Sequence, residues 1–256
     1  MKRKFGQNFL INTKIIEQII SLSNINNNSI VYEVGAGMGA LTKEIIKINP
    51  QKYLAIEIDP DLKEYLNKYF NNNNHILKFT DSLKFNELNF FSNDATIISN
   101  LPYNISLKLL VKWIYQFSQK KWFSSMILMF QKEVGERIVA RENSKKYGRI
   151  SILTSAFFST SKVLEIDKKN FMPVPKVDSV LIKFDKLSKP FLTNDDLPKL
   201  EKLTKIFFST RRKKLEKKIK LIFSNELIEK YNLNQYYSLR AESLSRDTFY
   251  FLTKIQ

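Results

Sequence analysis

Cysteine is absent from this chain of 256 residues, and histidine occurs only once, at His75. The absence of cysteine excludes disulfide bonds, thiolate metal sites and cysteine nucleophiles. A single histidine leaves little material for a histidine metal cluster or a Ser-His-Asp triad. His75 follows a run of asparagines, and we interpret it as a surface or strand-edge residue. The sequence therefore predicts chemistry that uses neither a metal ion nor a histidine base.

Long hydrophobic runs are also missing. No window approaches 18 consecutive apolar residues, which a membrane-spanning helix would need. The N-terminal stretch "MKRKFGQNFLIN" lacks the apolar core of a signal peptide. The composition is 43% hydrophobic and 13% aromatic, enough for one sizeable core and a small second domain. We expect a soluble, cytoplasmic protein with no membrane association.

Acidic residues are scarce relative to basic ones. The chain has 42 Lys and Arg against 25 Asp and Glu, which gives a net charge of +17. This excess favours a polyanionic partner, with nucleic acid first and an anionic membrane surface second. The alternative is a general abundance of Lys and Asn, as in proteins from AT-rich genomes. The asparagine runs around residues 24–28 and 71–74 fit that alternative and are expected to be loops.

Strand-like and helix-like segments alternate through the first 185 residues. Buried strands are predicted at 29–35, 53–59, 75–81, 95–100 and 124–131, and helices at 40–48, 61–70, 107–117 and 132–140. Short apolar runs at 161–166 and 179–184 are expected to complete the sheet. This alternation is typical of βαβ units, and it predicts an α/β fold with a Rossmann-like sheet.

A polar, proline-containing segment at 185–198 has the composition of a linker. Beyond it the pattern becomes helical, and residues 186–256 carry 16 basic against 8 acidic side chains. The sequence therefore predicts an α/β domain over 1–185 and a small, helical, basic domain over 186–256.

A glycine-rich turn, "EVGAGMGA", follows the first predicted strand. Gly35, Gly37 and Gly39 permit positive φ angles and a close approach of the backbone to a ligand. The spacing fits both a dinucleotide fingerprint and an S-adenosylmethionine loop, while a tight strand-to-helix turn is the alternative. Glu57, near the end of the second strand, is placed to accept from both ribose hydroxyls, and Asp81 to accept from an adenine amine. Together they indicate an adenosine-containing cofactor, with NAD and S-adenosylmethionine both still open.

The tetrapeptide Asn100-Leu101-Pro102-Tyr103 falls at the end of the fourth strand, where open α/β sheets bind ligands. The carbonyls of the Asn100 side chain and of the Leu101 backbone can accept hydrogen bonds from an exocyclic amine and make its nitrogen more reactive. Pro102 stiffens the loop, and the Tyr103 ring offers a face for stacking a base. Such catalysis is mostly positioning and needs no general base. The alternative is an ordinary turn with a buried tyrosine.

These motifs, in this order, resemble a known family. The chain is similar to the small-subunit ribosomal RNA adenine dimethyltransferases of the bacterial KsgA type. The resemblance covers nearly the whole chain and rests on "KFGQNFL" from Lys4, "EVGAGMGALT", "NLPYNIS", "QKEV", "YGRISI" and "FMPVPKVDSV". It implies transfer of methyl groups from S-adenosylmethionine, with S-adenosylhomocysteine as product, to two adjacent adenosines in a hairpin loop near the 3′ end of 16S rRNA.

The resemblance also implies roles for individual residues. The expected cofactor-binding residues are Asn8, Leu10, Gly35, Gly37, Glu57, Asp81 and Asn100. Asn8 and Leu10 belong to a segment that closes over the cofactor, whereas the glycines approach its methionine part. The expected catalytic residues are Asn100, Leu101, Pro102, Tyr103 and Phe171. Phe171 would cover the second face of the target adenine, although it reads equally well as a hydrophobic plug.

A strongly basic stretch, "RRKKLEKKIK", starts at Arg211. Leu215 and Ile219 are four residues apart, so a helix would place both on one face and leave the remaining faces basic. We interpret this stretch as a phosphate-contacting surface, while a solvated helix face is the alternative. The residues expected to bind RNA are Arg211, Arg212, Lys213, Lys214, Lys217 and Lys218.

Three other functions remain to be weighed against this one. A related methylase that confers macrolide resistance through large-subunit rRNA shares the glycine loop and the tetrapeptide, but "YGRISI" and "FMPVPKVDSV" favour the small-subunit enzyme. An NAD-dependent oxidoreductase would leave the tetrapeptide and the basic stretch unexplained. A non-catalytic ribosome assembly factor would not need the tetrapeptide or the acidic strand ends. We expect a monomer with a role in small-subunit biogenesis.

Overall fold

The chain divides into two compact units in the computed structural model, which describes residues 7–256. The first unit contains the chain up to Gly135 together with Ser161–Asp185, and the second contains Glu136–Thr160 and Lys186–Gln256. A change of unit at 185/186 was expected from the sequence, but residues 136–160 were expected in the first unit and lie in the second. The reason is packing: the Tyr250 hydroxyl donates to the Ile152 carbonyl (3.0 Å), and the Arg211 guanidinium to the Tyr147 carbonyl (2.8 Å).

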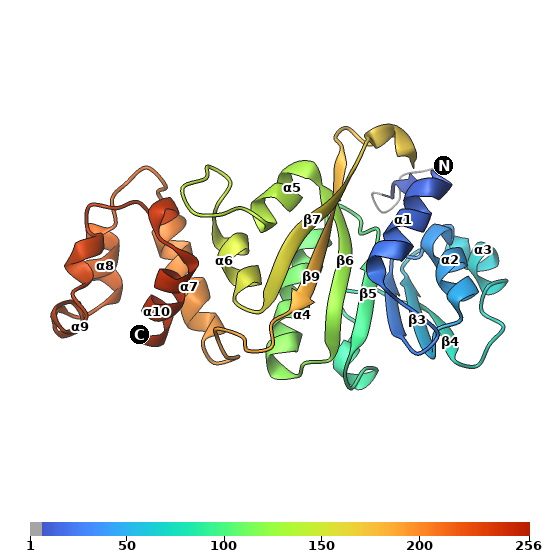
Figure 1. Cartoon of the computed structure of the whole chain (residues 1–256), viewed down its shortest axis with the longest axis horizontal. Helices are drawn as coiled ribbons and strands as arrows, with labels where there is room; N and C mark the ends of the chain where they lie inside the picture. Colours follow the sequence, from blue (N-terminus) through green and yellow to red (C-terminus); the bar gives the residue numbers. More distant parts are fainter. Residues whose placement is uncertain (1–6) are drawn as a thin grey trace. The chain divides into compact units, whose positions relative to one another are not determined.

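A seven-stranded sheet forms the centre of the first unit (Figure 1). Its strand order is β4-β3-β2-β5-β6-β9-β7. The strands are β2 (Ile30–Val34), β3 (Lys52–Glu57), β4 (His75–Phe79), β5 (Ala95–Ser99), β6 (Phe123–Gln131), β7 (Phe158–Ile166) and β9 (Ser179–Lys186). Strands β2 to β6 pair in parallel, and β9 pairs antiparallel with β6. The strand order therefore changes direction at β2: β3 and β4 are added on one side of it, and β5 and β6 on the other. Open α/β sheets bind ligands at such a switch point, beyond the carboxyl ends of the two neighbouring strands.

The sequence explains why these strands lie in the middle of the unit. Strands β2 and β5 read as nearly continuous apolar runs, and every residue of β5 is buried. Such runs are typical of parallel strands that are covered on both faces. The α/β, Rossmann-like fold is therefore confirmed, and so are the predicted strands, including the two that complete the sheet at 161–166 and 179–184.

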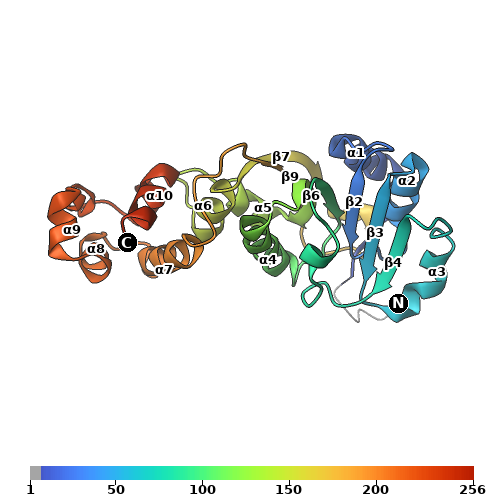
Figure 2. The same cartoon turned by 90° about the horizontal axis from the view of Figure 1, so that it is seen from below.

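Helices cover both faces of this sheet. Figure 2 shows α1 and α2 on one face and α4 on the other. The helices of this part are α1 (Thr13–Ser23), α2 (Ala40–Ile48), α3 (Lys63–Asn67), α4 (Ser106–Gln119) and α5 (Lys132–Ile138). The helix expected over 61–70 is shorter, because Pro60–Leu62 forms a 3-10 turn before α3.

The two faces of the sheet have different cores. On the α1 and α2 face, aliphatic side chains such as Ile19, Val31 and Ile45 form one buried cluster. On the α4 face, the rings of Tyr32 and Trp113 lie 6.2 Å apart. Alternate residues of β2 thus serve opposite cores, as the two-residue period of a strand requires.

A separate two-stranded pairing joins distant parts of the sequence. Strand β1 (Phe9–Leu10) pairs antiparallel with β8 (Phe171–Met172), so Leu10 lies opposite Phe171. Both side chains are almost fully buried, at 3% and 1% exposure. The last two residues of the N-terminal motif "KFGQNFL" are thereby attached to the strand that begins "FMPVP".

The second unit is helical. Its helices are α6 (Arg149–Ser155), α7 (Leu197–Phe208), α8 (Glu216–Ile222), α9 (Asn225–Lys230) and α10 (Arg246–Lys254), with 3-10 turns at Leu233–Tyr236 and Ala241–Ser243. Aromatic rings fill its interior, and Phe249 contacts both Phe207 and Phe208 at centroid distances of 5.9 and 5.7 Å. Over residues 7–256, none of the helices has the length and apolar character needed to cross a membrane.

Gly135 provides a test of the packing of α5 against the sheet. A Cβ atom at this position would lie 2.1 Å from Val180 Cγ2 and 3.3 Å from Ile182 Cδ1. We predict that Gly135→Ala lowers the free energy of unfolding by about 1–3 kcal/mol, because overpacking outweighs the better helix propensity of alanine. Chemical denaturation measures this difference.

Gly148 is the matched control, because a Cβ there would meet no atom within 4 Å and its extended backbone suits any residue. Gly148→Ala should leave stability within about 0.5 kcal/mol of the parent. In a Val180→Ala background, Gly135→Ala should cost less than it does alone. Equal stability of Gly135→Ala and the parent protein would contradict this description of the core.

Candidate active site

A hollow lies at the carboxyl ends of β2, β3, β4 and β5, in the first unit. We call it the strand-end hollow. Most residues singled out from the sequence line it: Asn8, Gly35, Gly37, Glu57, Asp81, Asn100, Leu101, Pro102 and Tyr103. Gln7, Phe9, Thr80 and Ser82 are among its other lining residues. The structure thus brings the glycine turn, the two acidic strand ends and the tetrapeptide together.

The glycine turn forms one wall of the hollow. Gly35 and Gly37 have φ angles of +73° and +58°, a region that side-chain-bearing residues rarely adopt. A Cβ on Gly37 would also lie 3.1 Å from two carbon atoms of the Phe9 ring. Glycine is therefore required at Gly37 both by the backbone conformation and by the aromatic ring packed against it.

The carboxylate of Glu57 is buried and anchors this turn. Its Oε2 accepts from the Gly37 N–H at 2.8 Å, and its Oε1 accepts from Ile58 and Asp59 N–H groups at 2.8 and 3.0 Å. A carboxylate has about four lone-pair directions, so these three bonds leave room for a further donor at Oε2. Burial raises the pKa of Glu57, while the three backbone bonds oppose this shift. Glu57 was expected to accept from both ribose hydroxyls, but only one of its acceptor directions, at Oε2, remains for a ligand.

Asp81 caps the turn that follows β4. Its Oδ1 accepts from the Leu83 N–H at 2.9 Å, and its backbone carbonyl accepts from the N–H groups of Lys84 and Phe85, each at 3.0 Å. Its second carboxylate oxygen, Oδ2, accepts from no residue in the described part of the chain. Asp81 lines the hollow and retains an acceptor oxygen for a further donor.

Asn100 connects the tetrapeptide to the N-terminal segment. Its Nδ2 donates to the Asn8 carbonyl at 3.0 Å. This bond uses the donor end of the amide and leaves Oδ1 as the acceptor end. Leu101 is buried at 1% exposure. Pro102 packs against the glycine turn: a Cβ added to Gly35 would lie 3.6 Å from Pro102 Cδ.

The Tyr103 ring is half-buried and is held at its hydroxyl. That hydroxyl is 2.6 Å from Ser179 Oγ, at the start of β9. Burial raises the pKa of Tyr103, so the phenol stays neutral at physiological pH. Ser179 was not singled out from the sequence, because a serine at a strand start carries no distinguishing pattern.

Two expected site residues lie away from the hollow. Leu10 does not line it; its buried side chain borders a second, smaller hollow beneath the glycine turn. Phe171 lines neither hollow and is buried at 1% exposure in the cluster that contains Leu10. In this structure Phe171 is the hydrophobic plug, and its ring does not offer a face to a base. Of the motif "KFGQNFL", residues 4–6 lie outside the described residues.

The basic stretch of the second unit is partly solvent-exposed. Arg212, Lys213, Lys214 and Lys217 are exposed, and the first three precede α8 rather than lying in it, so the expected helix is shorter. Leu215 and Ile219 are both buried at 0% exposure, in agreement with the predicted apolar face.

Two other cations of this stretch have structural partners. Arg211 is exposed, but it donates to the Tyr147 carbonyl and lies 3.2 Å from the Glu242 carboxylate. Lys218 is buried, and its Nζ donates to the carbonyls of Phe207 (2.6 Å) and Thr210 (3.0 Å). Burial lowers the pKa of Lys218. The expectation that Lys218 contacts RNA is therefore corrected: its ammonium holds the end of α7.

Glu33, the second-last residue of β2, is a buried carboxyl beside the smaller hollow. Its Oε2 accepts from Thr42 Oγ1 at 2.8 Å and from the Tyr53 hydroxyl. Burial raises the pKa of Glu33 from 4.5 to about 7, against the opposing effect of these two bonds. In the sequence it is visible only as the acidic residue two positions before the glycine turn.

The raised pKa of Glu33 predicts a pH dependence of stability. Between about pH 4.5 and pH 7 the folded chain keeps a proton that the unfolded chain loses, so stability falls as the pH rises. At about 1.4 kcal/mol per pKa unit, the fall amounts to about 3 kcal/mol. The free energy of unfolding, measured from pH 4 to pH 8, should fall in this way for the parent protein but not for Glu33→Gln. The control Glu17→Gln, which changes an exposed carboxyl, should behave like the parent. Parallel pH profiles for the parent and Glu33→Gln would contradict the assignment.

Comparison with known proteins places these features in a family. The family model described as "Ribosomal RNA adenine dimethylase" matches residues 1–252. The chain is 41% identical to a "Ribosomal RNA small subunit methyltransferase A" of Pelagibacter ubique (strain HTCC1062), over 99% of this chain and 95% of that protein. It is 39% identical to the protein of the same name from Wigglesworthia glossinidia brevipalpis, over 96% and 94%.

Solved structures agree with this relationship. A dimethyladenosine transferase from Plasmodium falciparum superposes with a TM-score of 0.83 and 28% identity, over 95% of each chain. The 23S rRNA methyltransferase ErmE shares the fold, with a TM-score of 0.72 and 21% identity over 97% of this chain and 99% of that one. With its glycine turn, acidic strand ends and Asn-Leu-Pro-Tyr loop gathered at one hollow, the chain belongs to the ribosomal RNA adenine dimethylase family.

Proposed function

We propose that this protein transfers methyl groups from S-adenosylmethionine to N6 of two adjacent adenosines in a hairpin loop near the 3′ end of 16S rRNA. The product is N6,N6-dimethyladenosine, and the cofactor leaves as S-adenosylhomocysteine. One observation carries the proposal: the tetrapeptide from Asn100 to Tyr103 lines the same hollow as Glu57 and Asp81. The enzyme would act as a cytoplasmic monomer during small-subunit biogenesis.

The strand-end hollow fits an adenosine-containing cofactor. Two carboxylates, Glu57 and Asp81, lie at the ends of neighbouring strands, where the hydroxyls of a ribose and the amine of an adenine need acceptors. Gly35 and Gly37, whose φ angles are positive, have no side chains, so this wall of the hollow is formed by backbone that a ligand can approach closely. S-adenosylmethionine, when bound, supplies an electrophilic methyl group. Asn8 would help to close the hollow, because its carbonyl already holds Asn100.

The tetrapeptide provides what an adenine amine requires. Asn100 Oδ1 and the Leu101 carbonyl are proposed to accept the two hydrogens of the amine, which favours a pyramidal, nucleophilic nitrogen. Acceptors fixed in advance stabilise the developing positive charge without a costly reorganisation during the reaction. Pro102 restricts the loop, and Asn100 is fixed through Nδ2. No group in this arrangement has to act as a general base.

Tyr103 is the proposed stacking surface for the target base. Its hydroxyl is fixed by Ser179, so the ring keeps its orientation while one face remains for the base. Sequence-specific recognition of RNA often uses loop bases that leave the helix and stack on aromatic rings. Phe171 has no part in this proposal, because its ring is buried.

The exposed cations before and within α8 are the proposed rRNA contacts. Arg212, Lys213, Lys214 and Lys217 lie within six residues of one another, and none is committed to an ion pair in the described structure. Contacts of this kind position an enzyme on phosphates without reading the sequence. They fit the net charge of +17.

Two alternatives are separated by a direct assay. The likeness to the ErmE structure concerns the fold alone, whereas the relatives named above at 39–41% identity carry the small-subunit name. Radiolabelled S-adenosylmethionine is offered with unmethylated small subunits, large subunits and free rRNA. Label in N6,N6-dimethyladenosine of 16S rRNA is expected. Label in large-subunit RNA would overturn the assignment in favour of the macrolide-resistance type, and no label in any RNA would favour a non-catalytic assembly factor.

Asn100 is the first residue to test. We predict that Asn100→Ala binds S-adenosylmethionine less well and lowers kcat by about 100-fold or more, because one preorganised acceptor is lost. Asn104→Ala, an exposed neighbour in the same loop, is the matched control and should keep near-parental activity. Single-turnover methyl transfer distinguishes the two, and full activity of Asn100→Ala would contradict the acceptor role.

The exposed cations should control the salt dependence of binding. Replacing Arg212, Lys213 and Lys214 together by alanine is predicted to weaken binding to the small subunit. The slope of log K against log[salt] should become shallower by about 2 to 3, since each lost phosphate contact removes roughly 0.7–0.9. Equilibrium binding measured from about 50 to about 300 mM salt, a roughly sixfold range, gives this slope.

A charge-matched control separates this surface from net charge. Replacing the exposed lysines Lys14, Lys43 and Lys63 of the first unit by alanine removes the same charge from another surface. That variant should keep the parental slope. An unchanged slope in the first triple variant, or equal slopes in both, would contradict the assignment.

A further inference from the structure

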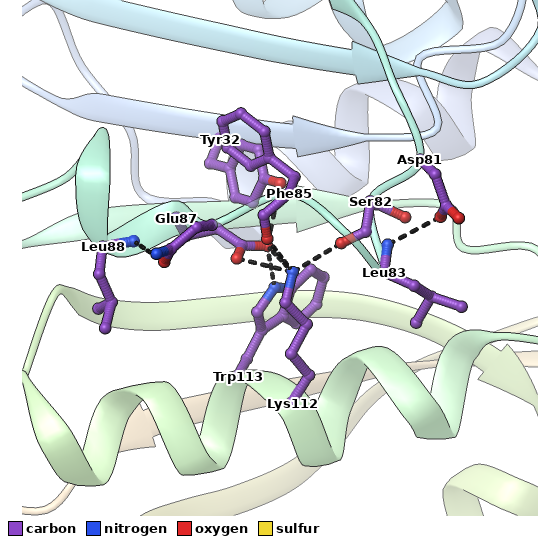
Figure 3. Close-up of polar contacts among 10 residues, drawn as sticks. Tyr32, Asp81, Ser82, Leu83, Phe85, Glu87, Leu88, Lys112 and Trp113 are labelled. Carbon is purple, nitrogen blue, oxygen red and sulfur yellow. Dashed lines mark hydrogen bonds and ion pairs between the residues drawn. The ribbon is translucent and has the colours of Figure 1, made fainter.

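A partly buried ammonium group lies next to the turn that follows Asp81, and Ser82 of this turn lines the strand-end hollow (Figure 3). Lys112, in the middle of α4, donates from Nζ to the Ser82 carbonyl at 2.6 Å and to the Phe85 carbonyl. It also contacts both carboxylate oxygens of Glu87, at 3.0 and 2.8 Å. The three N–H donors of a lysine are therefore all used within one short turn of the chain.

Glu87 is fixed as firmly as the lysine. It has 0% exposure, and its Oε1 also accepts from Trp113 Nε1 at 2.8 Å and from the Tyr32 hydroxyl at 3.2 Å. Burying one charge alone would be costly, whereas a paired and hydrogen-bonded lysine and glutamate are tolerated.

The turn that Lys112 holds is the one that carries Asp81. The Asp81 side chain and carbonyl accept from the N–H groups of residues 83 to 85. In addition, Lys112 Nζ donates to the carbonyls of Ser82 and Phe85. Both sets of hydrogen bonds thus restrict the turn that carries Asp81, which lines the hollow.

The helix that carries Lys112 also begins at the tetrapeptide. The N–H of Ser106, the first residue of α4, donates to the Pro102 carbonyl at 3.1 Å. Lys112 follows Ser106 by less than two turns of this helix. A single rigid element thus connects the proposed amine-binding loop with the proposed adenine-binding turn.

We propose that Lys112, paired with Glu87, is a positioning residue for recognition of the cofactor's adenine. It holds the Asp81–Phe85 turn so that Asp81 Oδ2 accepts from the exocyclic amine of adenine and rejects a base that presents a carbonyl there. The proposal rests on the adenosine-binding role given above to the strand-end hollow. It assigns to Lys112 no contact with cofactor or RNA.

The preference of the strand-end hollow for adenine over hypoxanthine tests this role. Dissociation constants are measured by calorimetry for S-adenosylhomocysteine and for S-inosylhomocysteine, in which a carbonyl replaces the amine. The parent should prefer the adenosine form. Lys112→Met should lower this preference about tenfold, because the loss of a charge-assisted hydrogen bond of this kind changes an equilibrium by about that factor. Lys108→Met, an exposed lysine one turn earlier in α4, should keep the parental preference.

A second variant separates positioning from a general loss of stability. Lys112→Met leaves the Glu87 carboxylate buried without its cation, whereas Lys112→Met/Glu87→Gln removes that charge and keeps an acceptor for Trp113. The double variant should recover most of the parental Tm but not the preference for adenine. The two Trp residues, at 113 and 122, provide a fluorescence check of the folded environment.

The outcomes are distinct. Recovery of both Tm and base preference in the double variant, or an unchanged preference in Lys112→Met, would overturn the positioning role while leaving the hollow as the cofactor site. Failure of the parent protein to bind S-adenosylhomocysteine, or to distinguish the two bases, would instead contradict the proposed function on which this inference rests.

Discussion

The hydrogen bond from the Gly37 N–H to the Glu57 carboxylate is the interaction on which the site depends. It ties the glycine turn after β2 to the end of β3, and it holds a backbone wall of positive-φ glycines open toward the hollow. The order of the strands then places β5, with Asn100 at its end, on the other side of β2. A carboxylate that must accept from backbone groups in this way cannot be replaced by a neutral side chain without releasing the turn.

The proposed catalysis at this site depends on fixed acceptors rather than on titrating bases. Asn100 is oriented by Asn8, Tyr103 by Ser179, and the Asp81 turn by Lys112. Each of these groups is thus held in place by a hydrogen bond to a second residue. This arrangement explains how a chain with one histidine and no cysteine can serve a methyl-transfer reaction.

Much of the fold and of the candidate site was predictable from the sequence, because it follows from patterns within short segments. The apolar runs of β2 and β5, the glycine spacing and Pro102 each follow from the period or stereochemistry of a short segment. What the sequence left open, as for Phe171, or missed depends on long-range packing. Phe171 is a plug because β8 pairs with β1, more than 150 residues earlier in the chain, and Lys218 is buried because α8 folds back onto the end of α7. Lys112 reads as one more lysine in a helix, since its partners are 25 to 30 residues away.

In the proposed function, the strand-end hollow binds the adenosine part of the cofactor between Glu57 and Asp81, next to Asn100. A crystal structure of the protein with S-adenosylhomocysteine tests this binding mode. We expect a ribose hydroxyl to donate to the free direction of Glu57 Oε2, the adenine amine to donate to Asp81 Oδ2, and Asn100 to lie beside the sulfur. An adenosine bound elsewhere, or in this hollow without contact to either carboxylate, would contradict it.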